Sequence, residues 1–577
     1  MSVAESEINR GGVVLPHARV DPNFDSTGLR HDSEAAWRAA IADTDPERYQ
    51  LLSPPTDVYR KTLDAHTREV IVESEVGPQD YESLAEQLGP WAVRDMDYLK
   101  RTVGRLNGLR VEEANPTANG GGVQMILTDQ VNLLSKLGLD IHWRLMYPDP
   151  KTFLETKKWH NTTQAVANPT LEEIEAGFPT YEQWIDMNYW LIGEHLNQAD
   201  IVTIHDPQPH GLIPYIDKPV VWRSHIQNRT DLIATPGSPQ ERIWDYLWSG
   251  KVDQARAHVF HPVDEFVPHN VPAESVLHAP ATFDPFDDLN RLNLTGAEKQ
   301  KGRDFIDEQL ETSFMRKLAE APAEDDWSQS RVDWERPIMS LIARFDPSKG
   351  MPPTLIAYAE ARDRMVALGI LKEEIPQLVM IGNGSVDDPD GEPELIKMMG
   401  LRARLDGDLK DDVKIIRVPH NDMAINTLMH EADFGLQPSL AEGFETRASD
   451  WIWHGKPVIV SNRGGLPLQV YEGKSGFVVD PDNTDLLAQR MFELSTNTAQ
   501  YNEMARWAEY LGKTYNYREF STVANAIRWV EIYSAVLEGR PHYGRRWRIS
   551  EIVDGEVPPE TVNFSRKLGS TSLRNNR

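Results

Sequence analysis

The stretch LRVEEANPTANGGGVQMILTDQVNLLSKLGLDIHWRLM, residues 109–146, decides the fold. It starts with a short run typical of a strand and passes through three glycines at 120–122. The next segment has apolar side chains at helical spacing, and Gly138 is placed to end that helix. DIHWRLM then has the pattern of a second strand. A strand, a helix and a strand in this order predict a βαβ unit of a parallel sheet.

The same alternation continues along the chain in two separate series. Short apolar runs such as IVTIH (201–205) and VVWRSH (220–225) belong to the first, and runs such as IMSLIA (338–343) and LVMIG (378–382) belong to the second. We therefore predict an α/β fold with two doubly wound domains whose strands are buried on both faces. The predicted divisions are an N-terminal, partly helical extension at 1–105, a first Rossmann-like domain at 106–330, a second at 331–515, and a C-terminal helix and tail at 516–577.

Composition excludes several classes of function. The formal net charge of −29 disfavours non-specific binding to nucleic acids and to anionic membranes, both of which need a cationic surface. The chain has no cysteine, which excludes disulfides, thiolate catalysis and cysteine-ligated zinc. The first residues lack a signal-peptide pattern and no apolar run is long enough to span a membrane, so a cytoplasmic protein is expected. Neither a metal nor a tightly bound cofactor is expected.

Ligands of open parallel sheets bind beyond the carboxyl ends of the strands, so polar residues there are the site candidates. Gly121 and Gly122 open a helix directly after a strand, where exposed N–H groups and the helix dipole favour an anion. A tight turn between strand and helix would explain the same glycines. Arg344 and Lys349 follow the strand IMSLIA and would neutralise a leaving phosphate. Pairing of these two cations with Asp346 in a solvated loop is the alternative.

Histidines end two of the predicted strands in the first series. His205 and Asp206 follow IVTI, and a histidine at this place can bind a sugar hydroxyl or assist at the reacting centre. His225, at the end of VVWRSH, is a similar but weaker candidate. A packed or solvent-facing histidine is the alternative for both.

The segment AEGFETRASDW (441–451) places two acids and a base at a junction between a loop and a helix. Glu442 lies in the loop after a strand, where a carboxylate can bind sugar hydroxyls. Arg447 lies in the first helical turn, which is unfavourable for a cation unless an anion binds there. Asp450 is the second acid. Ordinary surface charge would explain each residue taken singly, and the chain shows neither a Ser-His-Asp signature nor an H-E-x-x-H motif.

Together these motifs resemble the retaining glycosyltransferases of the GT-B fold, in particular the group of trehalose glycosyltransferring synthase and trehalose phosphorylase. The resemblance covers about residues 80–500. It rests on NGGGVQMIL, TKKWHNTTQ, HDPQPHGLIPY, VVWRSHI, RFDPSKG, EGFETRASDWIWHGKPVIV and GGLPLQVYEGKSGFVV. It implies two Rossmann-like domains facing a cleft, and a C-terminal helix that crosses back to the first domain. It also implies front-face substitution, in which no protein nucleophile is needed.

The resemblance also implies roles for the candidate residues. Arg344 and Lys349, with the Gly121 and Gly122 backbone, would hold the departing phosphate. Glu442 would bind donor-sugar hydroxyls, and His205 would lie beside donor and acceptor. Arg447 would add charge for the donor phosphate, Asp206 and His225 would contact substrate, and Asp450 stands where nucleotide-sugar users bind the ribose.

The segment departs from the synthase pattern REGFGLT and from its second acid. Ala441 replaces an arginine, Glu445 replaces a glycine, and Asp450 is one methylene shorter than the usual glutamate. Arg447 stands where the phosphorylases have a lysine. These changes favour the phosphorylase branch, or a different donor or acceptor, whereas the greater usual length of phosphorylase chains weighs the other way.

The function expected from the sequence is a retaining hexosyltransferase. It would move a hexose such as glucose from an ADP-, UDP- or GDP-hexose to a sugar or small polar acceptor, forming an α-glycoside such as trehalose. One alternative is a phosphorylase of trehalose-type disaccharides that uses hexose 1-phosphate, and another is a non-catalytic sugar-binding protein. Small-molecule substrates and a homodimer are expected as partners. The sequence leaves open the donor base, the acceptor and the role of the N-terminal extension.

Overall fold

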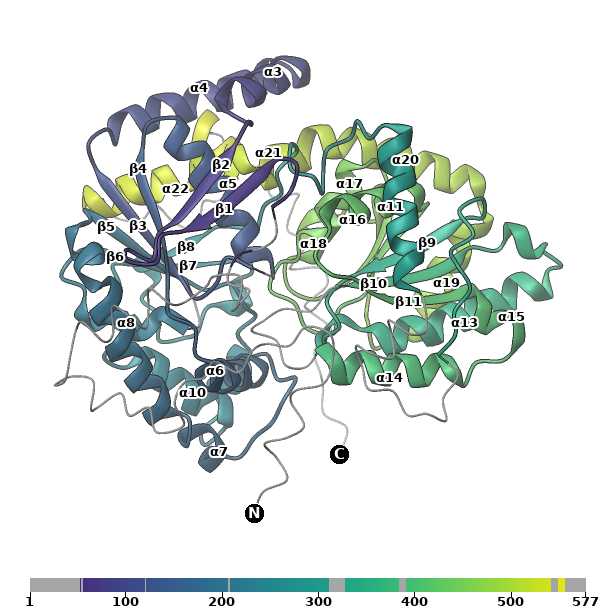
Figure 1. Ribbon diagram of the computed structural model, residues 1–577, viewed down its shortest axis with the longest axis horizontal. Helices are drawn as coiled ribbons and strands as arrows, with labels where there is room; N and C mark the ends of the chain where they lie inside the picture. The colour runs from purple at the N-terminus through teal and green to yellow at the C-terminus, as the bar shows by residue number, and fades with distance from the viewer. Residues whose placement is uncertain are drawn as a thin grey trace.

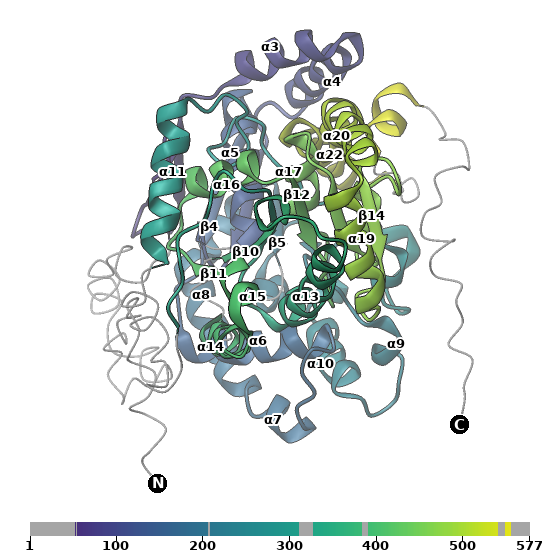
Figure 2. The same cartoon turned by 90° about the vertical axis from the view of Figure 1, so that its right-hand side faces the viewer.

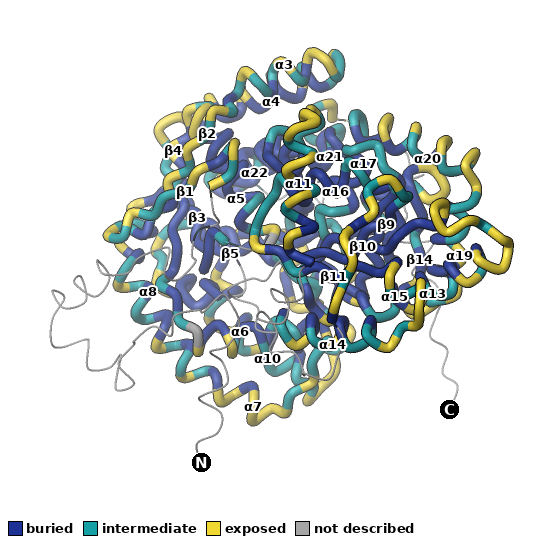
Figure 3. The backbone as a smooth tube through the Cα atoms, turned by 45° about the vertical axis from the view of Figure 1, so that its right-hand side comes forward, coloured by how far each residue is buried: buried dark blue, intermediate teal, exposed yellow. Residues whose placement is uncertain are grey.

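The computed structural model describes residues 52, 55–119, 121–205, 208–310, 327–382, 391–540 and 548–555. Two six-stranded parallel sheets form the cores of two domains that lie side by side (Figure 1). The two predicted Rossmann-like domains of a GT-B fold are thereby confirmed. The strands are dark with burial in Figure 3, whereas the outward faces of the surrounding helices are exposed. Among the described residues, no helix has the length and apolar character needed to cross a membrane.

The first sheet has the strand order β4-β3-β5-β6-β7-β8. Its strands are β3 (Arg110–Asn115), β4 (Asp140–Leu145), β5 (Ile201–His205), β6 (Val220–Arg223), β7 (Ala257–Phe260) and β8 (Val276–His278). The main helices around it are α5 (Gly121–Lys136), α6 (Pro150–Thr163), α7 (Leu171–Glu175), α8 (Phe178–Gln198), α9 (Thr230–Ile233) and α10 (Pro239–Trp248). β3 is the point at which the winding of the sheet changes direction, because β4 lies on one side of it and the later strands lie on the other. Ligands of such parallel sheets bind at this point.

The second sheet has the order β11-β10-β9-β12-β13-β14. Its strands are β9 (Ile338–Ile342), β10 (Gln377–Gly382), β11 (Val413–Arg417), β12 (Phe434–Gln437), β13 (Val458–Ser461) and β14 (Gly476–Val479). Its helices are α13 (Met351–Ala367), α14 (Gly391–Ala403), α15 (Gly407–Asp412), α16 (Asp422–Glu431), α17 (Arg447–Trp453), α18 (Leu466–Gln469), α19 (Thr484–Thr496) and α20 (Thr498–Leu511). The reversal here lies at β9, which is followed by Arg344 and Lys349.

The βαβ unit predicted from residues 109–146 is present as β3, α5 and β4. The two strands pair in parallel, with Arg110 opposite Asp140 and Asn115 opposite Leu145. Leu127 and Leu134 of α5 are fully buried against the sheet. Gly138 has φ 99°, a left-handed conformation that glycine adopts without steric cost, and it turns the chain from α5 into β4.

The segment before the first sheet contains a β-hairpin that the sequence interpretation missed. β1 (Tyr59–Leu63) pairs antiparallel with β2 (Val70–Ser74). Two helices follow, α3 (Pro78–Leu88) and α4 (Pro90–Arg105), in the region where helical patterning was predicted. The hairpin packs beside the first sheet, where Lys61 Nζ donates to Gln124 Oε1 of α5 at 2.5 Å.

The last long helix, α22 (Thr522–Leu537), packs on the first domain although it follows the second in the chain (Figures 1 and 2). It contacts α4 and α5, and its apolar side chains Val523, Ile527, Val530 and Tyr533 are buried. The short helix α21 (Tyr517–Phe520) leads into it. The crossover helix implied by the family resemblance is therefore present.

Two connections between the domains run side by side at the hinge. The Phe283 N–H donates to the Phe520 carbonyl at 2.8 Å, and the Thr522 N–H donates to the Phe283 carbonyl at 3.0 Å. One connection then continues through α11 (Gly296–Gln309) into the second domain.

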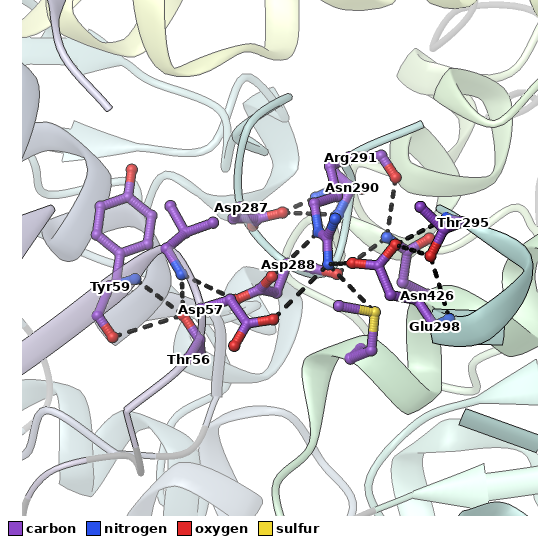
Figure 4. Close-up of polar contacts among 12 residues, drawn as sticks. Thr56, Asp57, Tyr59, Asp287, Asp288, Asn290, Arg291, Thr295, Glu298 and Asn426 are labelled. Carbon is purple, nitrogen blue, oxygen red and sulfur yellow. Dashed lines mark hydrogen bonds and ion pairs between the residues drawn. The ribbon is translucent and has the colours of Figure 1, made fainter. Parts of the chain in front are cut away.

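The N-terminal segment also meets this hinge (Figure 4). The Val58 N–H donates to Asp288 Oδ2 at 3.1 Å, and Asn426 Nδ2 of α16 donates to the Asp288 carbonyl at 2.9 Å. Arg291 Nε donates to Asp288 Oδ1 at 3.1 Å, which holds the linker in place. Two distant parts of the chain, the N-terminal segment and α16, thus contact the same linker residue.

A cluster of buried acids lies behind the hinge. Asp284 accepts hydrogen bonds from Tyr81 Oη at 2.5 Å and Thr522 Oγ1 at 3.1 Å. Burial raises the pKa of Asp129, Asp284 and Asp287, and the repulsion of neighbouring acids adds to the shift for Asp129 and Asp287. The folded protein therefore retains protons here that the unfolded chain releases above about pH 4.

This cluster predicts the pH dependence of stability. With a raised folded-state pKa, Asp287 makes the free energy of unfolding decrease as the pH rises above its ordinary carboxyl value. We expect Asp287→Asn, which keeps the Oδ1 acceptor for the Asn290 N–H, to raise the melting temperature at pH 8 by roughly 2 °C. At pH 4 the difference should vanish.

The measurement is thermal unfolding of the two proteins across this pH range. The exposed Asp363→Asn is the matched control and should leave the melting temperature unchanged at every pH. If the melting temperatures of wild type and Asp287→Asn depended on pH in the same way, a raised pKa of Asp287 would be refuted.

Candidate active site

A cleft of about 290 Å³ lies between the two domains, at the carboxyl ends of strands from both sheets. Several residues proposed from the sequence line it together: Gly122, His225, Arg344, Lys349, Glu442 and Arg447. Gly121 is the first residue of α5, while His205 and Asp450 lie behind the lining. Asp206 lies outside the described residues.

Lys349 is the best-defined cation of the cleft. It ends the short helical turn Pro347–Lys349, and its Nζ donates to Glu442 Oε2 at 2.5 Å and to Glu445 Oε2 at 2.9 Å. Burial alone would lower the pKa of Lys349, but the two carboxylates outweigh it and raise the pKa above its ordinary value. The ammonium group is therefore charged at any physiological pH.

The acid loop between β12 and α17 supplies both carboxylates. Burial raises the pKa of Glu442, a shift that Lys349 opposes and Glu445 adds to. For Glu445, the cations Lys349 and Arg447 overcome burial and lower the pKa to about 2. Glu445 has φ 60°, a left-handed backbone that is strained for any residue with a β-carbon. Sequence analysis identified Glu445 as a departure from the synthase pattern but assigned it no role in the site.

Arg447 and Asp450 pair with each other on one face of α17. Arg447 Nη1 donates to Asp450 Oδ2 at 2.5 Å. Asp450 is only 1% exposed, and burial raises its pKa to about 6 although Arg447 opposes the shift. The charge of Asp450 raises the pKa of Asp287 at the hinge, which places this carboxylate near the acid cluster. Arg447 lines the cleft, whereas Asp450 does not.

The two histidines of the first domain lie one behind the other. His225 lines the cleft, and its Nε2 lies 2.8 Å from Nδ1 of His205. His205 is 2% exposed, and its Nε2 donates to Glu113 Oε2 at 2.7 Å. His225 is therefore the histidine at the cleft wall, and His205 contacts it from the interior.

Helix α6 adds two residues that the sequence interpretation did not assign. Lys157 and His160 line the cleft, and Lys157 Nζ donates to Asp346 Oδ2 of the second domain at 3.2 Å. Burial lowers the pKa of His160 to about 3, and the charge of Lys157 adds to the shift. Sequence analysis could have grouped Lys157 and His160 in TKKWHNTTQ, because residues three apart lie on the same face of a helix.

The acid loop touches the first domain through Gly443. A β-carbon at this position would lie 2.5 Å from the His225 carbonyl oxygen. The neighbouring Glu442 N–H donates to Gln227 Oε1 at 3.2 Å. The close approach of the two domains therefore requires glycine at 443.

We expect Gly443→Ala to force the acid loop away from His225 and to open the cleft. The melting temperature should fall and the radius of gyration should increase, because the clash is with backbone and cannot be relieved by a rotamer change. Differential scanning calorimetry and small-angle X-ray scattering measure these two effects.

Gly400→Ala in helix α14 is the control, since an added β-carbon there meets nothing within 4 Å. It should leave both quantities unchanged or slightly raise the melting temperature. If Gly443→Ala and Gly400→Ala had the same melting temperature and radius of gyration, the requirement for glycine at 443 would be refuted.

Family models match both domains of the chain. Residues 113–268 match the N-terminal domain of trehalose synthase, and residues 337–497 match the glycosyl transferases group 1 model. A trehalose synthase of Thermococcus litoralis is 30% identical over 403 residues, which are 69% of this chain and 85% of that protein. A trehalose phosphorylase of Grifola frondosa is 33% identical over 488 residues, which are 80% of this chain and 64% of that protein. With two Pleurotus trehalose phosphorylases the match covers 56% and 57% of their lengths.

Solved structures agree on the fold. A UDP-forming trehalose-phosphate synthase from Burkholderia xenovorans, solved with glucose-6-phosphate, superposes with a TM-score of 0.53 at 13% identity. The match covers 75% of this chain and 100% of that one. An E. coli protein solved with UDP-2-fluoro glucose gives a TM-score of 0.53 at 13% identity, over 74% and 99% of the two chains.

Proposed function

Because this chain belongs to the trehalose synthase family of group 1 glycosyltransferases, we propose that it transfers a hexose, with retention, between a phosphate-linked donor and a sugar hydroxyl. The product would be an α-glycoside such as trehalose. The support is the convergence of Arg344, Lys349 and the start of α5 on one cleft that also contains Glu442.

The residues fit a reaction driven by positioning and electrostatics. The bond between the hexose C1 and the phosphate oxygen breaks, and the acceptor oxygen bonds to C1 on the same face. The acceptor proton passes to the departing phosphate oxygen, so no protein base is required. Arg344 and Lys349 stabilise the charge on that phosphate, and N–H groups at the start of α5 add to it. Glu442 binds hexose hydroxyls and orients C1.

For the donor, we favour hexose 1-phosphate. The reverse reaction is then the phosphorolysis of a trehalose-type disaccharide, in which inorganic phosphate accepts the hexose. One observation supports this choice. Asp450, at the position that would bind a ribose, is paired with Arg447 and lies behind the cleft wall. Arg447 itself lines the cleft, where a guanidinium suits a free phosphate.

A nucleotide-sugar donor is the second candidate. Apolar residues at the ends of β9 and β11 and on α16 extend the cleft lining: Ile342, Val418 and Ile425. Such a surface suits a nucleotide base, and an ADP-, UDP- or GDP-hexose would then be the donor.

A homodimer and a cytoplasmic location stay predictions.

The test is a comparison of two assays on the purified chain. Incubation with trehalose and phosphate should release glucose 1-phosphate, and incubation with nucleotide glucoses plus glucose should release no nucleoside diphosphate. Nucleotide release without phosphorolysis would establish the second candidate. Turnover in neither assay, with other hexoses and disaccharides included, would refute hexosyl transfer by this chain.

A substitution at Glu442 tests the assigned role. We expect Glu442→Gln to lower kcat/KM by ~100-fold, because the isosteric amide cannot accept from the hexose and from Lys349 as the carboxylate does. The melting temperature should change little. Glu373→Gln, at an exposed position of the same domain, is the control and should behave as wild type.

A further inference from the structure

We propose that Gln124 binds the donor phosphate with the N–H groups of its carboxamide, and that Lys61 is the positioning residue that fixes this orientation. The inference rests on the proposed function for its ligand, a phosphate group, and adds one contact to the same site. Lys61 belongs to the hairpin β1–β2, which lies outside both regions matched by the family models. The N-terminal segment thereby gains a role in the cleft.

Gln124 lies where a phosphate ligand is expected. It is in the first turn of α5 and lines the cleft. Residues three apart share a helix face, so Gln124 lies on the face that starts with Gly121. Only 4% of Gln124 is exposed, and the cleft is the space from which a ligand can reach it.

The contact with Lys61 determines which end of the carboxamide points where. Lys61 Nζ donates to Gln124 Oε1 at 2.5 Å and to Thr128 Oγ1 at 3.4 Å. The Thr128 hydroxyl donates its own proton to the Gln124 backbone carbonyl at 2.7 Å, which leaves its oxygen free to accept. An ammonium group has donors only, so the carboxamide atom that faces Lys61 is the oxygen. Gln124 Nε2 is therefore turned away from Lys61.

Lys61 is charged at neutral pH. Burial lowers the pKa of Lys61 to about 8, although the charges of Asp422 and Asp129 oppose the shift. At pH 7 the side chain is thus an ammonium ion. Lys61 does not belong to the described residues that line the cleft, so it acts through Gln124.

The nitrogen of the carboxamide is open to a ligand. Within the described part of the chain, no group accepts a hydrogen bond from Gln124 Nε2, and this atom is not one of the buried polar atoms that lack a partner. Polar groups sealed inside a protein are almost always paired. An N–H group that is neither paired nor sealed can donate to a molecule in the cleft.

The neighbouring charges favour an anion as that molecule. Lys61 lies at the oxygen end of the carboxamide, so the positive end of the amide dipole points toward the cleft. The ammonium charge also polarises the amide, which strengthens a hydrogen bond from Gln124 Nε2 to an anion. A phosphate oxygen gains more from this arrangement than a neutral sugar hydroxyl does.

Arg447 lies at the same end of the cleft as Lys61. Burial raises the pKa of Asp422, a shift that His420 overcomes. The charges of Arg447 and Lys61 also lower the pKa of Asp422, so both cations lie near this carboxylate. Asp422 and Arg447 line the cleft, which places the Gln124 carboxamide at the end that holds the Arg447 guanidinium.

The experiment measures phosphate binding without turnover. Isothermal titration calorimetry at pH 7 gives the Kd of inorganic phosphate and of glucose 1-phosphate, and thermal unfolding gives the stability of each variant. Gln124→Met removes the N–H groups without adding charge. Gln124→Glu keeps the shape of the side chain and places a carboxylate against the ligand. Gln183→Glu, at an exposed position of α8, is the control for the added charge.

We expect Gln124→Met to weaken the binding of both ligands by roughly 10-fold, the usual effect of losing a hydrogen bond to a charged group. Gln124→Glu should weaken it by roughly 100-fold, because a like charge is added to a lost donor. Its melting temperature should not fall, since the new carboxylate pairs with Lys61. A purely structural role of Gln124 would lower the melting temperature as well. Gln183→Glu should bind as wild type does.

A second set of variants tests the role of Lys61. Lys61→Met lets the carboxamide turn and should weaken phosphate binding by roughly 5-fold. Lys61→Arg restores a cationic donor and should recover most of the affinity. Arg60→Met, at the exposed neighbouring position of β1, is the control and should leave the Kd unchanged.

Three results would overturn the proposal. One is wild-type affinity in Gln124→Met, the second is wild-type affinity in Lys61→Met, and the third is a wild-type protein that binds neither inorganic phosphate nor glucose 1-phosphate. If the Kd values change as expected but the wild type transfers no hexose, the proposed function fails and the binding of phosphate by Gln124 stands.

Discussion

The packing of α22 on α4 and α5 is the contact on which the rest of the structure depends. It joins the end of the second domain to the core of the first, and its buried face includes Ile527 and Tyr533. Because the helix sits at the back of the first sheet, it fixes both the hinge and the carboxylate of Glu113. If the two domains were joined only by one flexible linker, their relative orientation and the shape of the cleft would vary.

Ion pairs between acidic and basic side chains fix the geometry of the cleft. Two acids share Lys349, and the balance between burial and this cation pushes the two carboxyl pKa values in opposite directions. Arg447 is neutralised in part by Asp450, and Lys157 reaches across to Asp346. Lys157, Lys349 and Arg447 of the cleft lining are thus each already paired with an acid. A bound phosphate has to compete with these acids for the cations, which weakens its binding and favours its release.

Much of the fold follows from sequence pattern, because strands buried on both faces give short continuous apolar runs such as IVTIH and IMSLI. The placement of Arg344, Lys349 and Glu442 at the cleft follows from the same rule, since each comes after a strand. The hairpin β1–β2 was missed because YRKTL and VIVES are short and lie in a polar region. Sequence analysis ranked His205 above His225, although both end buried strands, and only the packed structure shows that His225 is the one that lines the cleft.

The paired crossings at Phe283 and Thr522 restrict how the two halves can move. The two segments pair in parallel at Phe283 and Ser521, and two backbone segments tied by hydrogen bonds resist twisting and sliding more than a single segment does. Paired crossings of this kind favour bending of the domains about one line, and the contact between Gly443 and the His225 carbonyl lies on the side of the cleft that such bending would open or close. These two hydrogen bonds therefore act together with the packing of α22 to keep the two sides of the cleft in register.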